Sequence, residues 1–132
     1  MNIVLIAHAI IFNDKNELLI TKKSMTDDIL PGYWDTPGGR IEEGEDPEVG
    51  VIRETKEETN LTIENPKLFF QKSSVDLEKN TQFVTLVFRT KYSGGNIVLN
   101  PDDHEECKWI NTEDVGKYKM VEWLGEVSIK LE

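Results

Sequence analysis

Residues 34–61 read WDTPGGRIEEGEDPEVGVIRETKEETNL, and this stretch decides the fold. The Pro37–Gly39 segment predicts a sharp turn, because proline fixes φ and glycine permits positive φ. Asp46 then has the chemistry of a helix N-cap, and proline follows it at the first helical position. The pattern predicts a helix over 47–59 that ends at Asn60, a residue suited to a left-handed C-terminal cap.

The predicted helix carries a cluster of carboxylates. At 100° per residue, Glu54, Glu57 and Glu58 fall within an arc of about 100°. A solvated face with ion pairs is the ordinary explanation of such a cluster. However, like charges at i and i+4 cost an isolated helix about 0.2–0.5 kcal/mol, and a glycine-rich loop precedes this helix. Clustered carboxylates beside backbone carbonyls are typical ligands of hard cations such as Mg²⁺.

The apolar side of the same helix is thin. The helical projection places Ile52 opposite the carboxylates, flanked by Val49 and Val51. Thr55 and Thr59 occupy positions where aliphatic side chains would pack better. The sequence therefore predicts a helix that presents three carboxylates on one face and has few aliphatic side chains to pack on the other.

Outside this helix, the chain has mainly strand patterns. Strands are expected over 3–12, 17–23, 67–73, 82–92 and 106–111, with a terminal helix over 121–131. The first two strands form a hairpin through turn chemistry at 13–16. A long loop over 24–46 holds four of the nine glycines, and ordered loops of this length in small domains are usually functional. These elements predict an α+β fold with a mixed sheet between helices.

Size and charge limit the function further. A chain of 132 residues is most simply one domain, 1–132. Its formal net charge of −10 disfavours long nucleic acid and anionic membranes as partners. Cys107 is the only cysteine, so no internal disulfide forms, and we interpret it as a buried, inert thiol. The apolar run 3–12 is too short to span a bilayer, and a cytoplasmic protein is expected.

From Gly39 to Leu61 the chain resembles the Nudix hydrolase family. The signature of that family is G-x5-E-x7-R-E-U-x-E-E-x-G-U, where U is aliphatic, and every charged position matches in residues 39–61. Two positions depart from it. Thr55 replaces an aliphatic residue, and Asn60 replaces a glycine whose left-handed conformation Asn tolerates. The resemblance continues in NELLITKKS before the loop and in DDHEECKW at 102–109.

The resemblance implies an α/β/α sandwich on a mixed sheet, with a loop–helix–loop metal site. A bound cation would let this acidic protein handle a polyphosphate, since the cation attracts phosphate oxygens. The implied ligands of Mg²⁺, or of Mn²⁺ in its place, are Glu54, Glu57, Glu58 and the carbonyl of Gly38. Glu54 is alternatively the general base. Arg53 is expected to orient the carboxylates, and Glu45 to hold the loop.

Further site residues follow from the same resemblance. Family members often use a carboxylate from the loop before the last strand, and four residues qualify: Asp102, Asp103, Glu105 and Glu106. Asp103 is preferred as a catalytic group by its distance from Trp109. Lys23, more than its neighbour Lys22, is expected to meet phosphate. The other expected substrate contacts are Trp34, Thr36 and Gly39, with a core position as the alternative for Trp34.

Met120 and Trp123 are candidates for lining a base pocket. The histidines, His8 and His104, receive no role, because the sequence gives no reason to place them together. For the four candidate carboxylates of the loop before the last strand, the alternative to a function is that they are simply solvated surface charges.

The implied reaction is hydrolysis of a diphosphate linkage in a nucleoside diphosphate derivative. A modified or ordinary nucleoside triphosphate, cleaved to monophosphate and pyrophosphate, is the favoured substrate. ADP-ribose, a nucleotide sugar or a dinucleotide polyphosphate are alternatives. A non-catalytic nucleotide sensor is disfavoured because the carboxylates are kept, and an isomerase is disfavoured because Cys107 lies in the wrong place. A small nucleotide is the expected partner, and the protein is expected to be a monomer or homodimer.

Overall fold

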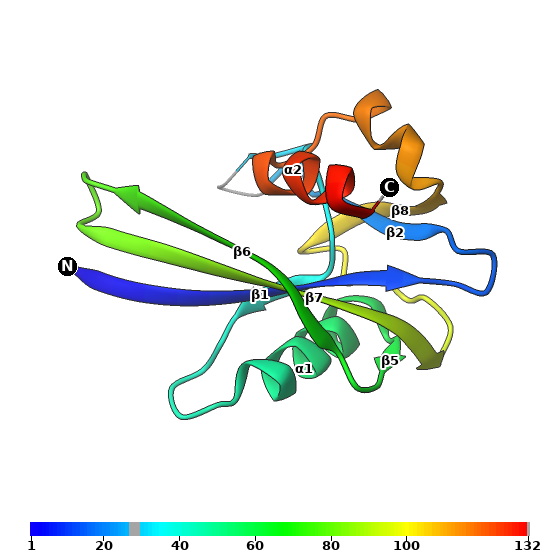
Figure 1. Ribbon diagram of the computed structural model, residues 1–132, viewed down its shortest axis with the longest axis horizontal. Coiled ribbons are helices and arrows are strands. Elements are labelled where there is room, and N and C mark those ends of the chain that lie inside the picture. Colours follow the sequence, from blue (N-terminus) through cyan, green and yellow to red (C-terminus); the bar gives the residue numbers. More distant parts are fainter. Residues whose placement is uncertain (27–29, 132) are drawn as a thin grey trace.

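The computed structural model describes residues 1–26 and 30–131. A mixed β-sheet lies between helices, with α1 on one face and α2 on the other (Figure 1). Along the chain the elements are β1 (Asn2–Phe12), β2 (Leu18–Lys23), β3 (Trp34–Asp35), β4 (Gly38–Arg40), α1 (Pro47–Thr59), β5 (Thr62–Ile63), β6 (Lys67–Asp76), β7 (Thr81–Gly94), β8 (His104–Ile110), the 3₁₀ helix η1 (Thr112–Lys117) and α2 (Glu122–Leu131). The predicted α+β class with a mixed sheet is confirmed.

Strand β1 organises the sheet. It pairs in parallel with β7 along its whole length and antiparallel with β2 at the hairpin, where Phe12 faces Leu18. Further along, β1 pairs with β4 through Ile6–His8, while β2 pairs with β3 and β8. Strands β1 and β2 therefore diverge beyond the hairpin, and this divergence makes room for a cavity at the centre of the sheet.

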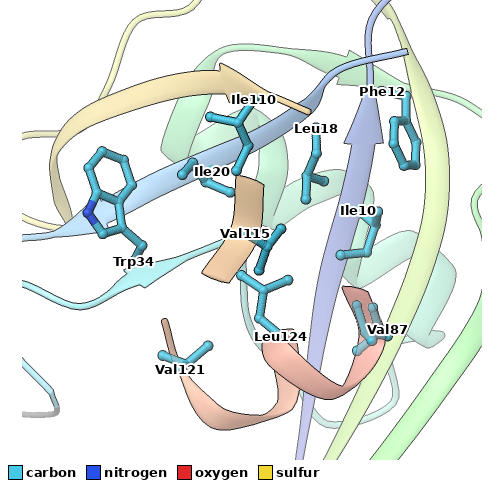
Figure 2. Packing of buried hydrophobic residues seen from close by; sticks show 11 residues of the cluster. Ile10, Phe12, Leu18, Ile20, Trp34, Val87, Ile110, Val115, Val121 and Leu124 are labelled. Atoms are coloured by element: carbon cyan, nitrogen blue, oxygen red, sulfur yellow. The ribbon is translucent and has the colours of Figure 1, made fainter. Parts of the chain in front are cut away.

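Two hydrophobic clusters cover the two faces of the sheet. Alternation along β1 points Ala7, Ala9 and Ile11 toward the face covered by α1. Ile10 and Phe12 point the opposite way, into the cluster beneath α2 and η1 (Figure 2). The apolar strand predicted over 3–12 is buried on both faces only from Ala7 to Phe12. Its first half is not, since Ile3 is 65% exposed and Leu5 39% exposed.

The long loop predicted over 24–46 contains two short strands. Strand β3 pairs with β2, and β4 pairs with β1, so these pairings fix the loop against the sheet. Residues 27–29 of this loop lie outside the described part of the chain. The 3₁₀ helix η1 was not expected from sequence, and β8 begins at His104, two residues before the predicted strand.

The predicted apolar face of α1 is wrong in its orientation. Val49 is 57% exposed and Ile52 is only partly buried, whereas Val51, Thr55 and Thr59 are completely buried. The helix packs against β1 and β4, so the side carrying Val51 and Thr55 turns toward the sheet. Hydrophobicity along the helix could not predict this orientation, because two threonines occupy the buried side.

No helix in the described ranges has the length and apolar character needed to cross a bilayer. The cytoplasmic location, the extent of the single domain and the oligomeric state stay predictions from the sequence.

Candidate active site

Helix α1 has the caps that the sequence predicts. The Asp46 carboxylate accepts a hydrogen bond from the backbone N–H of Glu48 at 2.9 Å. At the other end Asn60 has φ of 67° and ψ of 1°, and its N–H donates to the carbonyl of Lys56 at 2.9 Å. The Asn60 amide also donates to the carbonyl of Asn96 at 3.0 Å. These contacts fix the length and register of the helix.

Arg53 joins the loop before α1 to the helix itself. Its Nε and Nη2 donate to the two carboxylate oxygens of Glu45, at 2.8 and 3.0 Å. Its Nη1 lies 3.1 Å from Glu54 and 3.2 Å from Glu57, and Nη2 donates to the carbonyl of Arg40 at 3.2 Å. Bidentate pairing of this kind fixes both partners. Arg53 thus connects the Glu45 loop to α1, and the orienting and loop-holding roles stay predictions.

The two glycines of the turn bring backbone close to two of the glutamates. The N–H of Gly38 donates to Oε2 of Glu58 at 3.2 Å. A side chain at Gly39 would place its Cβ 2.6 Å from Cδ of Glu54, and one at Gly38 would clash with the backbone of Ala7. Only glycine allows the helix carboxylates to approach β4 this closely.

Burial and pairing give the glutamates different pKa values. Glu58 is 7% exposed, and burial raises its pKa to about 9, with Glu54 and Asp103 adding like-charge repulsion. Burial also raises the pKa of Glu54, although the hydrogen bond from Arg53 opposes the shift. In contrast, the hydrogen bond from Arg53 lowers the pKa of Glu45 to about 2. Buried carboxylates that repel one another would gain from a bound cation.

A cavity of about 240 Å³ opens beside Glu58, between β4 and the ends of β2 and β8. Six of the residues predicted for the site line it: Lys23, Thr36, Gly38, Gly39, Glu58 and Asp103. Lys22, the neighbour of Lys23, instead pairs with Glu105 at 3.1 Å. Lys23 thus lines the cavity and Lys22 does not, and the pairing of β2 with β8 shifts register between the two.

The cavity also contains residues that sequence reasoning missed, namely His8, Asp35 and His104. Nδ1 of His104 is buried, lies 3.8 Å from Oε2 of Glu58 and has no hydrogen-bond partner among the described residues. Burial lowers the pKa of His104. The position of His104 within the acidic run DDHEEC was the one signal that the sequence offered. The pairing of β2 with β8 turns its side chain inward.

Other predicted residues lie elsewhere. Trp34 is 7% exposed and packs edge-on against Tyr118 within the cluster beneath α2, which supports the core alternative over a base contact. Glu57 is exposed and, like Arg53, does not line the cavity. Cys107 is partly buried, and burial raises the pKa of its thiol. Trp123 packs on His8, with the ring centroids 5.0 Å apart.

Within residues 1–26 and 30–131, no three His, Cys, Asp or Glu side chains converge as a ready metal cluster. Arg53 holds Glu54 and Glu57 in ion pairs at 3.1 and 3.2 Å. The donor set is nevertheless one of oxygens, and Glu58 has no basic side chain within ion-pairing distance in these ranges except His104. The side chains fit a hard cation in chemistry, although a cation would have to compete with Arg53.

A glycine-rich turn and an acidic helix, held by Arg53 against a mixed sheet, define a domain of the Nudix type. The family model of the NUDIX domain matches residues 3–131, and the chain belongs to this family. The MutT protein of Methanosarcina mazei Go1 has the same fold, with a TM-score of 0.82 and 25% identity, covering 98% of this chain and 91% of that one.

Two curated relatives are similar over part of the chain. The 8-oxo-dGTP diphosphatase of Escherichia coli is 37% identical over 83 residues, which are 63% of this chain and 61% of that protein. A MutT-like protein of Streptomyces ambofaciens is 36% identical over 88 residues, covering 65% of this chain and 53% of the relative. The matched stretch therefore spans between about half and three-fifths of these relatives.

Proposed function

We propose that this protein is a metal-dependent hydrolase that cleaves the diphosphate linkage of a nucleoside diphosphate derivative. The observation that carries the proposal is the cavity in which Glu58 and Asp103 lie with Lys23 beside the Gly38–Gly39 turn. Carboxylates and a lysine at one cavity suit a polyphosphate only when a cation joins them to it. Membership of the Nudix family supports the same chemistry.

The metal would be held by Glu54, Glu57, Glu58 and the carbonyl of Gly38. When bound, Mg²⁺ would neutralise phosphate oxygens and lower the pKa of a coordinated water. Glu54 and Glu57 would exchange part of their pairing with Arg53 for this role. Arg53 would keep its bidentate contact with Glu45, so the loop and the helix would stay joined while the carboxylates turn.

The remaining roles fall to residues around the cavity. Lys23 would meet phosphate oxygens as a point charge. Asp103 or Glu54 would accept the proton of the attacking water, and the two are not equivalent, because Asp103 lines the cavity and Glu54 does not. The proposed reaction attaches water to one phosphorus and releases the other phosphoryl group with the bridging oxygen.

A nucleoside triphosphate, cleaved to monophosphate and pyrophosphate, is the substrate we favour. Similarity to the 8-oxo-dGTP diphosphatase of Escherichia coli supports it, as does the position of Lys23. ADP-ribose, nucleotide sugars and dinucleotide polyphosphates are the competing substrates, and a protein that binds nucleotide without turnover is the competing function.

A substrate panel with Mg²⁺ tests the proposal, with inorganic phosphate and pyrophosphate measured separately. We expect pyrophosphate from a triphosphate. Lys23→Ala should raise KM, whereas the matched control Lys22→Ala should not, because Lys22 pairs with Glu105. Nucleotide binding without any product would support the sensor. Cleavage of ADP-ribose or a dinucleotide without release of inorganic phosphate or pyrophosphate would identify that compound as the substrate in place of a triphosphate.

A further inference from the structure

His8 and Glu58 reach the same cavity from opposite faces of the sheet. Along β1, alternation places His8 on the side of Ile10 and Phe12, which α2 covers. Glu58 belongs to α1, which covers the other face. Both residues line the same cavity, beyond the Phe12–Leu18 pair where β1 and β2 diverge. A diphosphate bound beside Glu58 would leave His8 to meet another part of the substrate.

The surroundings of His8 fix which ring nitrogen carries the proton. Nδ1 lies 2.9 Å from the backbone carbonyl oxygen of Thr36 and 3.5 Å from Oδ1 of Asp35. A carbonyl oxygen can only accept, so Nδ1 must donate to it. In the neutral ring, Nε2 then carries the lone pair and is an acceptor. No hydrogen bond to Nε2 is found among the described residues.

The ring is also held in place. Trp123 of α2 packs against it at 5.0 Å between centroids, with 48° between the planes. On the strand side, His8 is paired with Gly38, and a Cβ at Gly38 would lie only 2.6 Å from Nδ1. The residue is 9% exposed. A ring held on both sides presents its acceptor in one fixed direction, which is what selection between similar ligands requires.

We propose that His8 is a specificity-determining residue whose Nε2 accepts a hydrogen bond from an N–H or O–H group of the substrate's nucleoside. This inference rests on the proposed function. A substrate that lacks the donor leaves a largely buried acceptor unpaired and is turned over less well, by about fivefold or more. His8 acts on the choice of nucleoside and has no part in the diphosphate chemistry.

Pairs of substrates that differ by one donor test the proposal at pH 8.5. GTP and ITP differ in the 2-amino group, and GTP and dGTP differ in the 2′-hydroxyl group. In the wild type, kcat/KM should favour the donor-bearing member of at least one pair by about fivefold or more. His8→Gln places an amide oxygen near the position of Nε2 and should keep the preference. His8→Asn, which reaches only as far as Nδ1, should lose it.

A binding measurement supports the kinetic one. Calorimetry with the products GMP, IMP and dGMP should show the same preference and the same difference between the two variants, without any turnover. Thermal melting must show that both variants are folded; if His8→Asn is not, His8→Phe replaces it. A preference that survives His8→Asn or His8→Phe, or the absence of any preference in the wild type, overturns the inference while leaving the hydrolase intact. Failure of the wild type to cleave any nucleotide instead refutes the proposed function.

Discussion

Replacing Glu58 by glutamine should remove a pH dependence from the stability of the metal-free protein. Burial raises the pKa of Glu58 to about 9, from 4.5 for an ordinary glutamate. Between these two values, the folded protein holds a proton on Glu58 that the unfolded chain has released. Stability from this group is therefore full below pH 4.5 and is lost as the pH rises toward 9.

The size of the effect follows from the proton count. With one proton more in the folded state, the free energy of unfolding falls by about 1.4 kcal/mol per pH unit. From pH 7 to pH 8.5 the loss is about 2 kcal/mol, which lowers Tm by about 6–10 °C in a domain of this size. This interval lies above the titration of His104, whose pKa is lowered by burial.

Thermal and urea unfolding in excess chelator, from pH 7 to 8.5, measure this slope. Glu58→Gln should be flat, whereas Glu57→Gln is the matched control and should keep the wild-type slope, since Glu57 is exposed on the same helix. Saturating Mg²⁺ should flatten the wild-type slope, because a metal ligand must be ionised. A wild-type protein equally stable at both pH values, or a slope retained in Glu58→Gln, would refute the burial argument.

Chelator should abolish nucleotide hydrolysis and Mg²⁺ or Mn²⁺ should restore it; full turnover in excess chelator would contradict the mechanism. Glu57→Gln and Glu58→Gln should each remove most activity while leaving a folded protein by circular dichroism, and a lower Tm with lost activity would indicate a structural role instead. Thr55→Val should raise the free energy of unfolding by about 1 kcal/mol or more, because the Thr55 hydroxyl is buried with no partner among the described residues; a denaturant titration showing destabilisation would count against this. Asn60→Gly should change stability by less than about 1 kcal/mol, with near-normal kcat, whereas Asn60→Val should cost clearly more by thermal melting, since valine fits a φ of 67° poorly. Equal tolerance of valine and glycine there would mean that the left-handed cap is unimportant.

The bounds of α1 could be predicted because they depend on neighbouring residues. The Asp46 cap and the left-handed Asn60 act within one turn of the helix ends. The spacing of Glu54, Glu57 and Glu58 follows from helical geometry alone. The direction in which the helix faces could not be predicted in the same way, because the buried side is chosen by packing against β1 and β4. The position of Trp34 could not be predicted for the same reason. It packs against Tyr118, which is distant in the sequence, and the turn beside Trp34 gives no information about that contact.

The sequence by itself determined the acidic helix, its caps and its glycine turn, because these depend on local backbone preferences and short-range spacing. The order of strand and helix patterns also predicted the α+β class. Only the tertiary structure decided that Glu58 is buried and that His8 and His104 lie in the cavity beside it. His8 meets Thr36 across 28 positions of sequence, through the pairing of β1 with β4. Desolvation and such contacts depend on every segment packed around a residue, and no local pattern records them.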